Sequence, residues 1–392
     1  MPAKYSKIPI NTIIQGNALE VLKTLPDECI DMVVTSPPYW QLRTYEIPPQ
    51  AWNDGWEGEL GLEPYFYQYV DHLCDIFDEI KRVLKETGSI WVNLGDTYAG
   101  SNNGCNDRRE KTGLGTEPAK KYKGQKAGRV ENLPSKSLCQ IPNRFAIEMT
   151  NRSWILRNEL IWWKPNGLPN PVKDRFPVDF EKIFFFAKSK KYFFERQFEP
   201  YGKDQRLSGI QRAREYGYDG KGSYQDWYFN KRTKHSWVGK TDRLVKGFGQ
   251  GTRGQHRPKL VHPLGRSKRA VWRIATRPFA EAHFATYPPD LIKTPILAGC
   301  PELVCKKCGK PTEKIMGSEE KSERQKASGL DRWVNCECWA GYEPGIILDP
   351  FMGSGTTAVV AGELKRYFIG IELKPEYIKI AERRLGSLRP IS

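Results

Sequence analysis

The chain has 392 residues, of which 39% are hydrophobic and 28% are charged, and its formal net charge is +16. This composition is typical of a folded protein, and no apolar run approaches the roughly 20 residues that a membrane-spanning helix needs. The first residues also carry no secretory signal pattern. We therefore expect a cytoplasmic protein with no membrane partner.

The positive charge is concentrated in two stretches. Residues 201–270 hold 17 Lys and Arg against 5 Asp and Glu, and residues 98–136 hold 9 against 4. Basic stretches with interleaved aromatic residues suit a polyphosphate partner, because binding then releases condensed counterions. We interpret 201–270 as an inserted nucleic-acid-facing region and 98–136 as a mobile loop. A merely solvated basic loop would have the same composition.

The first 40 residues alternate between strand and helix patterns. A short strand over 12–14 is followed by a helix over 18–25, whose apolar residues recur at helical spacing. Residues 30–35 are nearly all Ile, Met and Val, as in a buried parallel strand. The segment Thr35-Ser36-Pro37-Pro38-Tyr39-Trp40 therefore lies where that strand ends.

The middle of the chain contains further helix and strand patterns, interrupted by the basic stretches. Helices are predicted over 63–84, 142–151 and 288–297. Strands are predicted over 90–94, 156–163, 181–187 and 271–274. Gly88-Ser89 is expected to separate the first helix from the strand after it. Residues 191–195 could pair with 181–187 as a hairpin.

The C-terminal block reads as strand 345–348, a Gly-rich turn, helix 356–364, strand 367–371 and helix 375–385. Glycines 353 and 355 let the backbone turn tightly and approach a ligand closely. The second strand is followed by Glu372, and an acidic residue there can bind both ribose hydroxyls of a nucleoside cofactor. The same spacing would suit a dinucleotide, so these residues alone do not distinguish between the two kinds of cofactor.

The Ser36-Pro37-Pro38-Tyr39 segment has the chemistry needed to methylate an exocyclic amine. The nitrogen lone pair of cytosine N4 or adenine N6 is delocalised into the ring, and acceptors aimed at both N–H groups would localise it. Ser36 Oγ and the Pro37 carbonyl can be those acceptors, while the two prolines stiffen the backbone. Tyr39 can stack on a base that has left the duplex. Taken alone, the tetrapeptide could equally be an ordinary turn.

Together these segments resemble the β group of amino-group DNA methyltransferases, which methylate cytosine N4 or adenine N6. In that group the catalytic motif comes first and the S-adenosylmethionine motif last. The supporting segments are 93–98, 162–166, 172–175 and 283–288. The resemblance implies an α/β, Rossmann-like, S-adenosylmethionine-dependent methyltransferase fold that is circularly permuted and acts on double-stranded DNA. Both motifs should then lie at carboxyl ends of neighbouring parallel strands.

The resemblance also implies a set of binding residues. The catalytic residues would be Ser36, Pro37, Pro38 and Tyr39. The cofactor-binding residues would be Asn17, Thr35, His283, Ala285, Thr286, Asp349, Pro350, Phe351, Gly353, Ser354, Gly355, Thr356 and Glu372. Phe351 would pack against the cofactor, and the glycines would make room for its methionine part. Many members have Asp where this chain has Asn17, whose carbonyl oxygen can still accept from the adenine amino group.

Four cysteines form two close pairs, Cys305-x-x-Cys308 and Cys336-x-Cys338, with 27 residues between the pairs. This grouping indicates a tetrahedral Zn²⁺ site with a structural role, similar to a zinc-ribbon knuckle. Reduced thiols without a metal are the alternative interpretation.

We therefore expect a catalytic domain over 1–200, 271–299 and 341–392, a basic target-recognition insertion over 201–270, and a Cys-rich ribbon over 300–340. Ser36 favours cytosine N4, because Ser-Pro-Pro-Tyr is typical of the cytosine enzymes of this family. The alternatives are adenine N6 methylation and, in another class, a non-catalytic zinc-containing nucleic-acid-binding protein. A partner endonuclease acting on the same site is expected, while the recognition sequence and the oligomeric state stay open.

Overall fold

A computed structural model describes residues 8–42, 44–45, 47–99, 133–167, 172–200, 266–277, 286–315, 332–334 and 336–386. The chain divides into two compact units, one of Met1–Glu195 with Ala270–Ser392 and one of Arg196–Arg269. In the second unit, strands β8 (Phe198–Glu199) and β9 (Arg266–Ser267) form an antiparallel pair. Most of the predicted basic insertion and most of the predicted loop over 98–136 lie outside the described residues.

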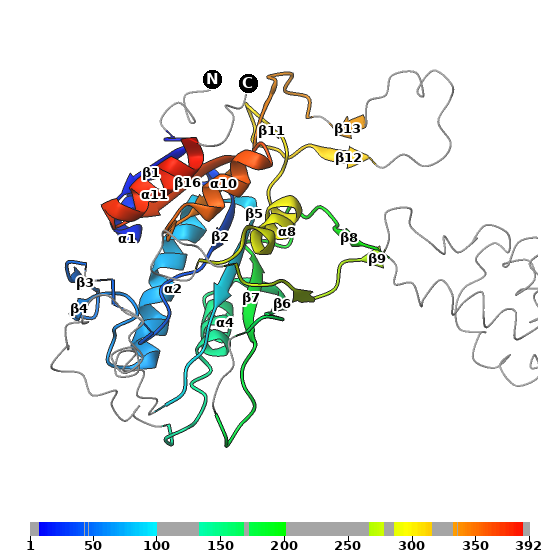
Figure 1. The fold of residues 1–392 in the computed structure, drawn as a ribbon. Coiled ribbons are helices and arrows are strands. Elements are labelled where there is room, and N and C mark those ends of the chain that lie inside the picture. Colours follow the sequence, from blue (N-terminus) through cyan, green and yellow to red (C-terminus); the bar gives the residue numbers. More distant parts are fainter. Residues whose placement is uncertain are drawn as a thin grey trace, which may run out of the picture. The chain divides into compact units, whose positions relative to one another are not determined.

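The described part of the first unit is built on an eight-stranded sheet with the order β1-β16-β15-β2-β5-β7-β6-β10 (Figure 1). The first five strands in this order run parallel, β7 is antiparallel to both of its neighbours, and β10 is parallel to β6. The bounds are β1 Thr12–Gln15, β16 Tyr367–Glu372, β15 Ile346–Asp349, β2 Ile30–Thr35, β5 Leu84–Leu94, β7 Phe180–Ala187, β6 Ile155–Trp163 and β10 Val271–Arg273. One edge of the sheet thus carries seven carboxyl ends and the start of β7.

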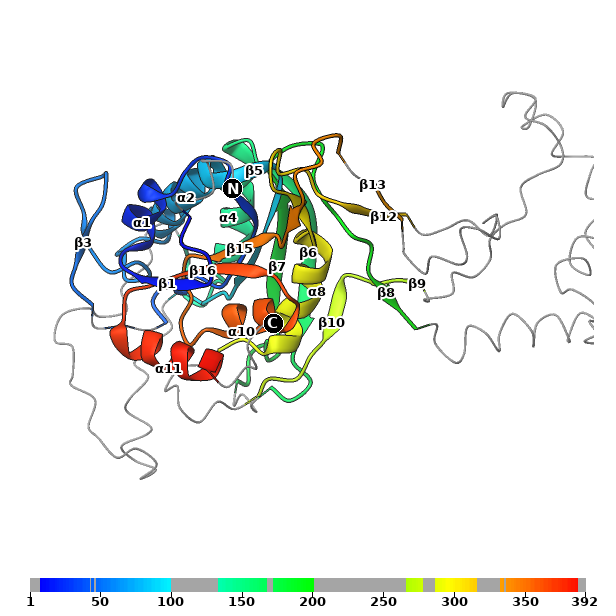
Figure 2. The same cartoon turned by 90° about the horizontal axis from the view of Figure 1, so that it is seen from above.

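Helices cover both faces of this sheet (Figure 2). On one face, α1 (Ala18–Thr24), α2 (Phe66–Val83) and α4 (Ile141–Asn151) share a hydrophobic core with the sheet. On the other, α8 (Pro289–Gly299) and α10 (Thr356–Glu363) form a second core, and α11 (Pro375–Gly386) packs beside α10. The apolar run of β2 follows from this layering, because a strand covered on both faces must bury every side chain.

The structure confirms the predicted strands and helices of the sheet domain, with shifts at their ends. Two expectations were wrong. Gly88-Ser89 does not separate helix from strand, since β5 starts at Leu84 directly after α2 and includes both residues. Residues 191–195 do not pair with β7, because β5 and β6 already occupy both of its edges.

Three further small antiparallel pairs lie outside the main sheet in the described part of the first unit. They are β3 (Gln50–Ala51) with β4 (Glu57–Gly58), β11 (Val304–Cys305) with β14 (Tyr342–Glu343), and β12 (Glu313–Ile315) with β13 (Arg332–Val334). The β3–β4 pair follows the Ser36–Tyr39 segment, and the other two belong to the cysteine-rich stretch. Among the helices that the structure describes, none is long and apolar enough to cross a membrane.

Candidate active site

The predicted site residues follow one another along the edge of the sheet where the parallel strands end. Asn17 comes after β1, Glu372 ends β16, Asp349 ends β15 and Thr35 ends β2. Since β15 is hydrogen-bonded to β2, the predicted adjacency of the two motif strands is confirmed. The carboxyl edge of a parallel α/β sheet is where such folds bind ligands.

A buried carboxylate joins the Gly-rich loop to the Ser36 segment. Thr35 Oγ1 donates to Asp349 Oδ1 at 2.7 Å, and the Phe351 amide donates to the same oxygen at 3.1 Å. Asp349 Oδ2 accepts from Tyr287 Oη at 3.0 Å and from the Thr357 hydroxyl. Four donors use the four lone-pair positions of a carboxylate. Asp349 therefore holds the surrounding segments together, and its predicted direct contact with a cofactor stays a prediction.

The Gly-rich loop is shaped by two glycines with positive φ. Gly353 has φ +54°, and its amide donates to Glu372 Oε2 at 2.8 Å. A Cβ at Gly353 would have no heavy atom closer than the Phe351 carbonyl oxygen at 4.0 Å, so the loop has open space beside it. Burial raises the pKa of Glu372, whereas the backbone donors from Lys374 and Gly353 oppose the rise. The Leu373 amide is a third backbone donor to this carboxylate, which leaves Glu372 one of its four lone-pair positions for a ribose hydroxyl.

Gly355→Ala is expected to lower stability by about 1–3 kcal/mol, the usual cost of a strained backbone position, and to weaken cofactor binding. Gly355 has φ +82°, and a Cβ there would lie 2.5 Å from Ala381 Cβ in α11. Thermal unfolding and a cofactor titration measure the two effects. Gly386→Ala is the matched control, because a Cβ at Gly386 meets nothing within 4 Å. Equal effects from both substitutions would contradict this account.

Other predicted cofactor residues have their side-chain atoms engaged within the protein. Ser354 Oγ and Thr356 Oγ1 both accept from Arg384 of α11, at 3.0 and 3.1 Å. Asn17 Oδ1 caps α1 by accepting from the amides of Leu19 and Glu20. An adenine amino group would compete with that cap. Pro350 is buried within the loop and Thr286 is half-buried, while His283 and Ala285 lie outside the described residues.

The Ser36–Tyr39 segment ends in a chain of polar contacts. Ser36 Oγ lies 3.3 Å from Tyr39 Oη, which lies 2.8 Å from Glu181 Oε2 and 3.1 Å from Asn93 Oδ1. Glu181 in turn forms an ion pair with Lys164, just beyond β6. The Tyr39 ring packs over Gly95, where a Cβ would come within 2.4 Å of it. Pro37 is buried, and the Pro38 carbonyl accepts from Tyr69 Oη at 2.7 Å.

This chain of contacts determines where the hydroxyl hydrogens point. Burial, and then the charge of Glu181, raise the pKa of Tyr39 well above its usual value of 10, so the phenol stays protonated. Its single hydrogen goes to the charged Glu181 acceptor, because charge-assisted hydrogen bonds are the stronger ones. Ser36 can then donate its own hydrogen to Tyr39 Oη. Both lone pairs of Ser36 Oγ remain available to accept.

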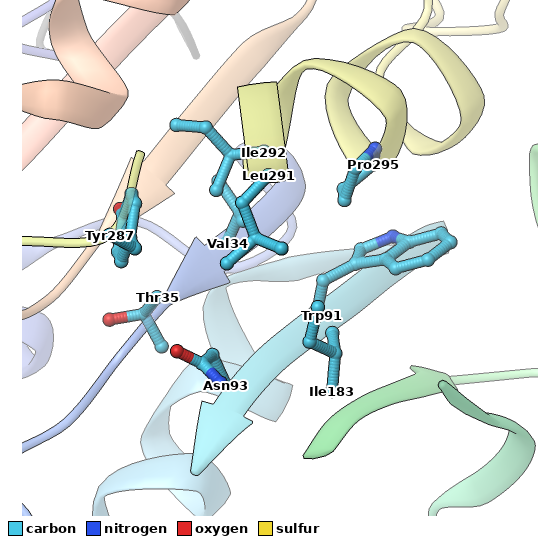
Figure 3. A pocket seen from close by; sticks show the side chains of 9 residues that line it. All are labelled: Val34, Thr35, Trp91, Asn93, Ile183, Tyr287, Leu291, Ile292 and Pro295. Carbon is cyan, nitrogen blue, oxygen red and sulfur yellow. The ribbon is translucent and has the colours of Figure 1, made fainter. Parts of the chain in front are cut away.

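A small cavity of about 10 Å³ lies beside these groups, which is close to the volume that one water requires. Figure 3 shows Thr35, Asn93 and Tyr287 along one side of it, and Trp91 and Pro295 on the other. Tyr287 is held here by Asp349. The cavity therefore borders the side chains that are hydrogen-bonded to Asp349, and it also borders Asn93, which contacts the Tyr39 hydroxyl.

Sequence reasoning missed several residues that the structure brings to this edge. They are Asn93, Gly95, Lys164, Glu181 and Tyr287. Four of them lie in segments quoted for the family resemblance, without an assigned role. Glu181 had a weaker signal, as an acidic residue at the start of a run of apolar strand residues.

A buried histidine supports the segment that follows Tyr39. Glu63 accepts from the Gly61 amide through its carboxylate and from Trp40 Nε1 through its carbonyl. His72 Nδ1 lies 3.1 Å from Glu63 Oε1, and its Nε2 lies 3.2 Å from Asp54 Oδ2. Burial alone would lower the pKa of His72, but these two carboxylates outweigh it and raise the pKa above 6.5.

The raised pKa of His72 predicts a pH-dependent contribution to stability. A group whose folded pKa exceeds its unfolded value stabilises the fold fully below the unfolded value. That contribution should be present below about pH 6.5 and be lost as the pH rises through the raised pKa of His72. Thermal unfolding of the protein and of His72→Gln across this range measures it. Parallel pH profiles for the two proteins would contradict the prediction.

Comparison with known proteins shows which family the chain resembles. A family model described as DNA methylase matches residues 30–383. The Type II methyltransferase M.Cfr9I of Citrobacter freundii is 31% identical, over 98% of this chain and 96% of its own length. The Type II methyltransferase M.XycI of Xanthomonas campestris pv. cyanopsidis is 32% identical, over 96% and 87%. The solved PvuII DNA methyltransferase (cytosine-N4-specific) covers 97% of this chain and 87% of its own at 16% identity, with a TM-score of 0.49.

The fold and the edge site define an α/β enzyme of the amino-methyltransferase class, which takes its methyl group from S-adenosylmethionine. Within that class, the chain belongs to the DNA methylase family of N6 and N4 methyltransferases, with Type II methyltransferases among its relatives. A non-catalytic nucleic-acid-binding protein was the alternative from another class, and membership of this enzyme family argues against it.

Proposed function

We propose that the protein is a site-specific DNA methyltransferase that methylates the N4 amine of a cytosine flipped out of double-stranded DNA. The observation that carries this proposal is the Thr35–Asp349 hydrogen bond of 2.7 Å. It joins β2, which ends immediately before Ser36, to β15, which leads into the Gly-rich loop. A methyl donor on the loop and an amine at Ser36 would therefore be neighbours.

S-adenosylmethionine fits the residues at this edge. Glu372 offers oxygens to the ribose, and the open space beside Gly353 leaves room for the ligand against the backbone. Phe351, two residues before Gly353, is half-buried and packs against the core. When bound, the cofactor supplies an electrophilic methyl group on sulfur. Asn17, beyond Glu372 along the edge, would lie toward the adenine end.

Ser36 would prepare the amine for reaction. Its Oγ can accept one N–H of the base amine, since its own hydrogen can be directed to Tyr39, and the Pro37 carbonyl can accept the other. Two acceptors localise the nitrogen lone pair toward the methyl group. The preference for cytosine is based on the family resemblance, in which Ser-Pro-Pro-Tyr is typical of the cytosine enzymes. No strong base is required, because the alkylated nitrogen becomes acidic and loses its proton to water.

The same edge of the sheet presents groups suited to DNA. Phe176, which precedes β7, is 93% exposed. Arg175 lies over the Tyr98 ring at 3.9 Å, and Arg273 at the end of β10 lies over the Trp163 ring at 5.5 Å. Cations contact phosphates, and an exposed aromatic ring can fill the space that a flipped base leaves. Flipping costs a few kcal/mol of unstacking, which such contacts offset.

The proposal extends to the arrangement of the chain. The basic unit Arg196–Arg269 would be the target-recognition region, inserted between β7 and β10. In the sheet, β15 and β16 from the C-terminal end lie between β1 and β2 from the N-terminal end. This order supports a circular permutation, with the cofactor half placed last in the chain. A cognate endonuclease is proposed because the curated relatives are Type II methyltransferases.

Transfer of labelled methyl groups tests the proposal. Duplex DNA is incubated with the protein and labelled S-adenosylmethionine, digested to nucleosides and chromatographed. Label in N4-methylcytosine is the expected result. Label in N6-methyladenine would overturn the cytosine assignment but keep the enzyme class, and absence of transfer to any DNA would overturn the function. Methylation-sensitive sequencing of DNA from an expressing host then gives the recognition site.

A further inference from the structure

We infer that Cys305, Cys308, Cys336 and Cys338 bind one Zn²⁺ ion, and that this ion anchors the strand leading into the Gly-rich loop. The four sulfur atoms all lie within 4.8 Å of one another. Tetrahedral zinc with Zn–S bonds of about 2.3 Å holds its sulfurs about 3.8 Å apart. Closing the set onto an ion therefore needs movements of about 1 Å or less.

The backbone around the first pair has the form of a metal-binding turn. Cys305 ends β11, and the Gly309 amide donates to the Cys305 carbonyl at 2.8 Å. Gly309 has φ +68°, as a tight turn after the second cysteine requires. The Lys307 amide lies 3.4 Å from Cys305 Sγ, directed at the sulfur. An amide donor of this kind favours a thiolate, which is the form that binds metal.

The second pair is brought to the first by backbone contacts. The Lys306 amide donates to the carbonyl of Gly341, which has φ +77°. Strand β11 pairs with β14, so that Cys305 faces Tyr342 across the pair. Cys308 is exposed and Cys336 and Cys338 are half-buried, so burial in a hydrophobic core does not explain why they meet. A shared ligand does.

The chemistry of the four sulfurs favours zinc. Four thiolates around a single point suit a closed, tetrahedral structural site. Two disulfides would account for pairs of sulfurs but not for one common group of four. An iron–sulfur cluster is wider than a single ion and holds its cysteines farther apart. Four thiolates and one Zn²⁺ leave a charge of −2, which Lys306, Lys307 and Lys310 help to offset.

The place of the site in the fold gives the ion a structural role. Only Pro344 and Gly345 separate β14 from β15, the strand that ends at Asp349. The Ile346 amide at the start of β15 donates to the buried Asp31 carboxylate at 2.9 Å. Zinc would therefore fix the β11–β14 pair immediately before β15 and close the chain between the two cysteine pairs. This inference does not depend on which base is methylated.

Metal content tests the site directly. The full chain is reduced, reconstituted with Zn²⁺, freed of excess metal and measured by mass spectrometry of the metal. One zinc per chain is expected, and Co²⁺ in its place should give the absorption of a tetrahedral thiolate site. Cys308→Ser should weaken zinc binding by more than about 100-fold in chelator competition, since even partners of the ligands typically contribute about 10- to 100-fold. Because Cys308 is exposed, this change leaves the core intact.

Two further variants make the test specific. Cys308→His should retain the zinc, since imidazole is also a zinc ligand. Cys300→Ala, which removes a buried thiol outside the cluster, should retain it as well. The inference is overturned if the reconstituted protein holds no zinc, or if Cys308→Ser binds zinc as tightly as Cys300→Ala does. A protein that binds zinc but transfers no methyl group would overturn only the proposed function.

Discussion

Ser36→Ala is expected to lower the rate of methyl transfer about 100- to 1000-fold while leaving S-adenosylmethionine binding nearly unchanged. The magnitude is that found when one preorganised hydrogen-bonding group is removed from an active site. Ser36 Oγ lies at the end of the Tyr39–Glu181 chain where the base amine is proposed to bind, whereas the predicted cofactor contacts come from the Gly-rich loop and Glu372. Single-turnover methyl transfer and a cofactor titration measure the two properties separately.

The matched control for this substitution is Ser189→Ala. Ser189 is a half-buried residue whose hydroxyl donates to the Glu86 carbonyl, outside the site. Its loss should leave both the transfer rate and cofactor binding close to those of the unmodified protein. If Ser36→Ala weakens cofactor binding as much as it slows transfer, the role given to Ser36 is wrong.

Glu181→Gln is expected to lower the transfer rate about 10- to 100-fold, through Tyr39 rather than through the substrate. Glutamine preserves the shape but removes the charge, and its amide group would face either the Lys164 ammonium or the Tyr39 hydroxyl. The Tyr39 hydrogen is then no longer held in one direction, so Ser36 loses its fixed acceptor for a hydrogen. Mutational losses of charged hydrogen bonds of about 1.5–3 kcal/mol give this range of rates.

A double-mutant cycle with Tyr39→Phe tests whether Glu181 acts through the phenol. Removing the Tyr39 hydroxyl breaks the same chain of contacts, so adding Glu181→Gln should slow the reaction little further. Residues that share one hydrogen-bond network show such non-additive effects. If the two losses multiply, Glu181 acts on the reaction by another route. A changed pH profile of the transfer rate in Glu181→Gln would separate positioning from simple loss of fold.

The sequence was sufficient to predict both motif strands and their adjacency. Residues 30–35 and 346–349 are short apolar runs that end in polar segments, and a parallel sheet buries such strands on both faces. The order of the strands was harder to predict. That β7 lies antiparallel between β5 and β6, which brings Glu181 to the edge, depends on pairings between distant segments that carry no local signal.

The hydrogen-bond partners of individual side chains were also not predictable from the sequence. Asn17, Ser354 and Thr356 have the right residue types in the right places for a ligand, yet their oxygens are used by the α1 amides and by Arg384. The start of β5 was misplaced for a related reason. The apolar pattern of α2 continues into Leu84 without interruption, so periodicity alone does not show where the helix ends.

The hydrogen bond between Thr35 and Asp349 spans 314 positions of the chain. Contacts of such long sequence separation are slow to form, because the intervening chain must first lose its conformational freedom. During synthesis, an emerging N-terminal portion would hold Ser36 and Tyr39 without the partner strand. Methylation competence would therefore arise only after β15 has left the ribosome, so partial chains that end before this strand would lack the activity.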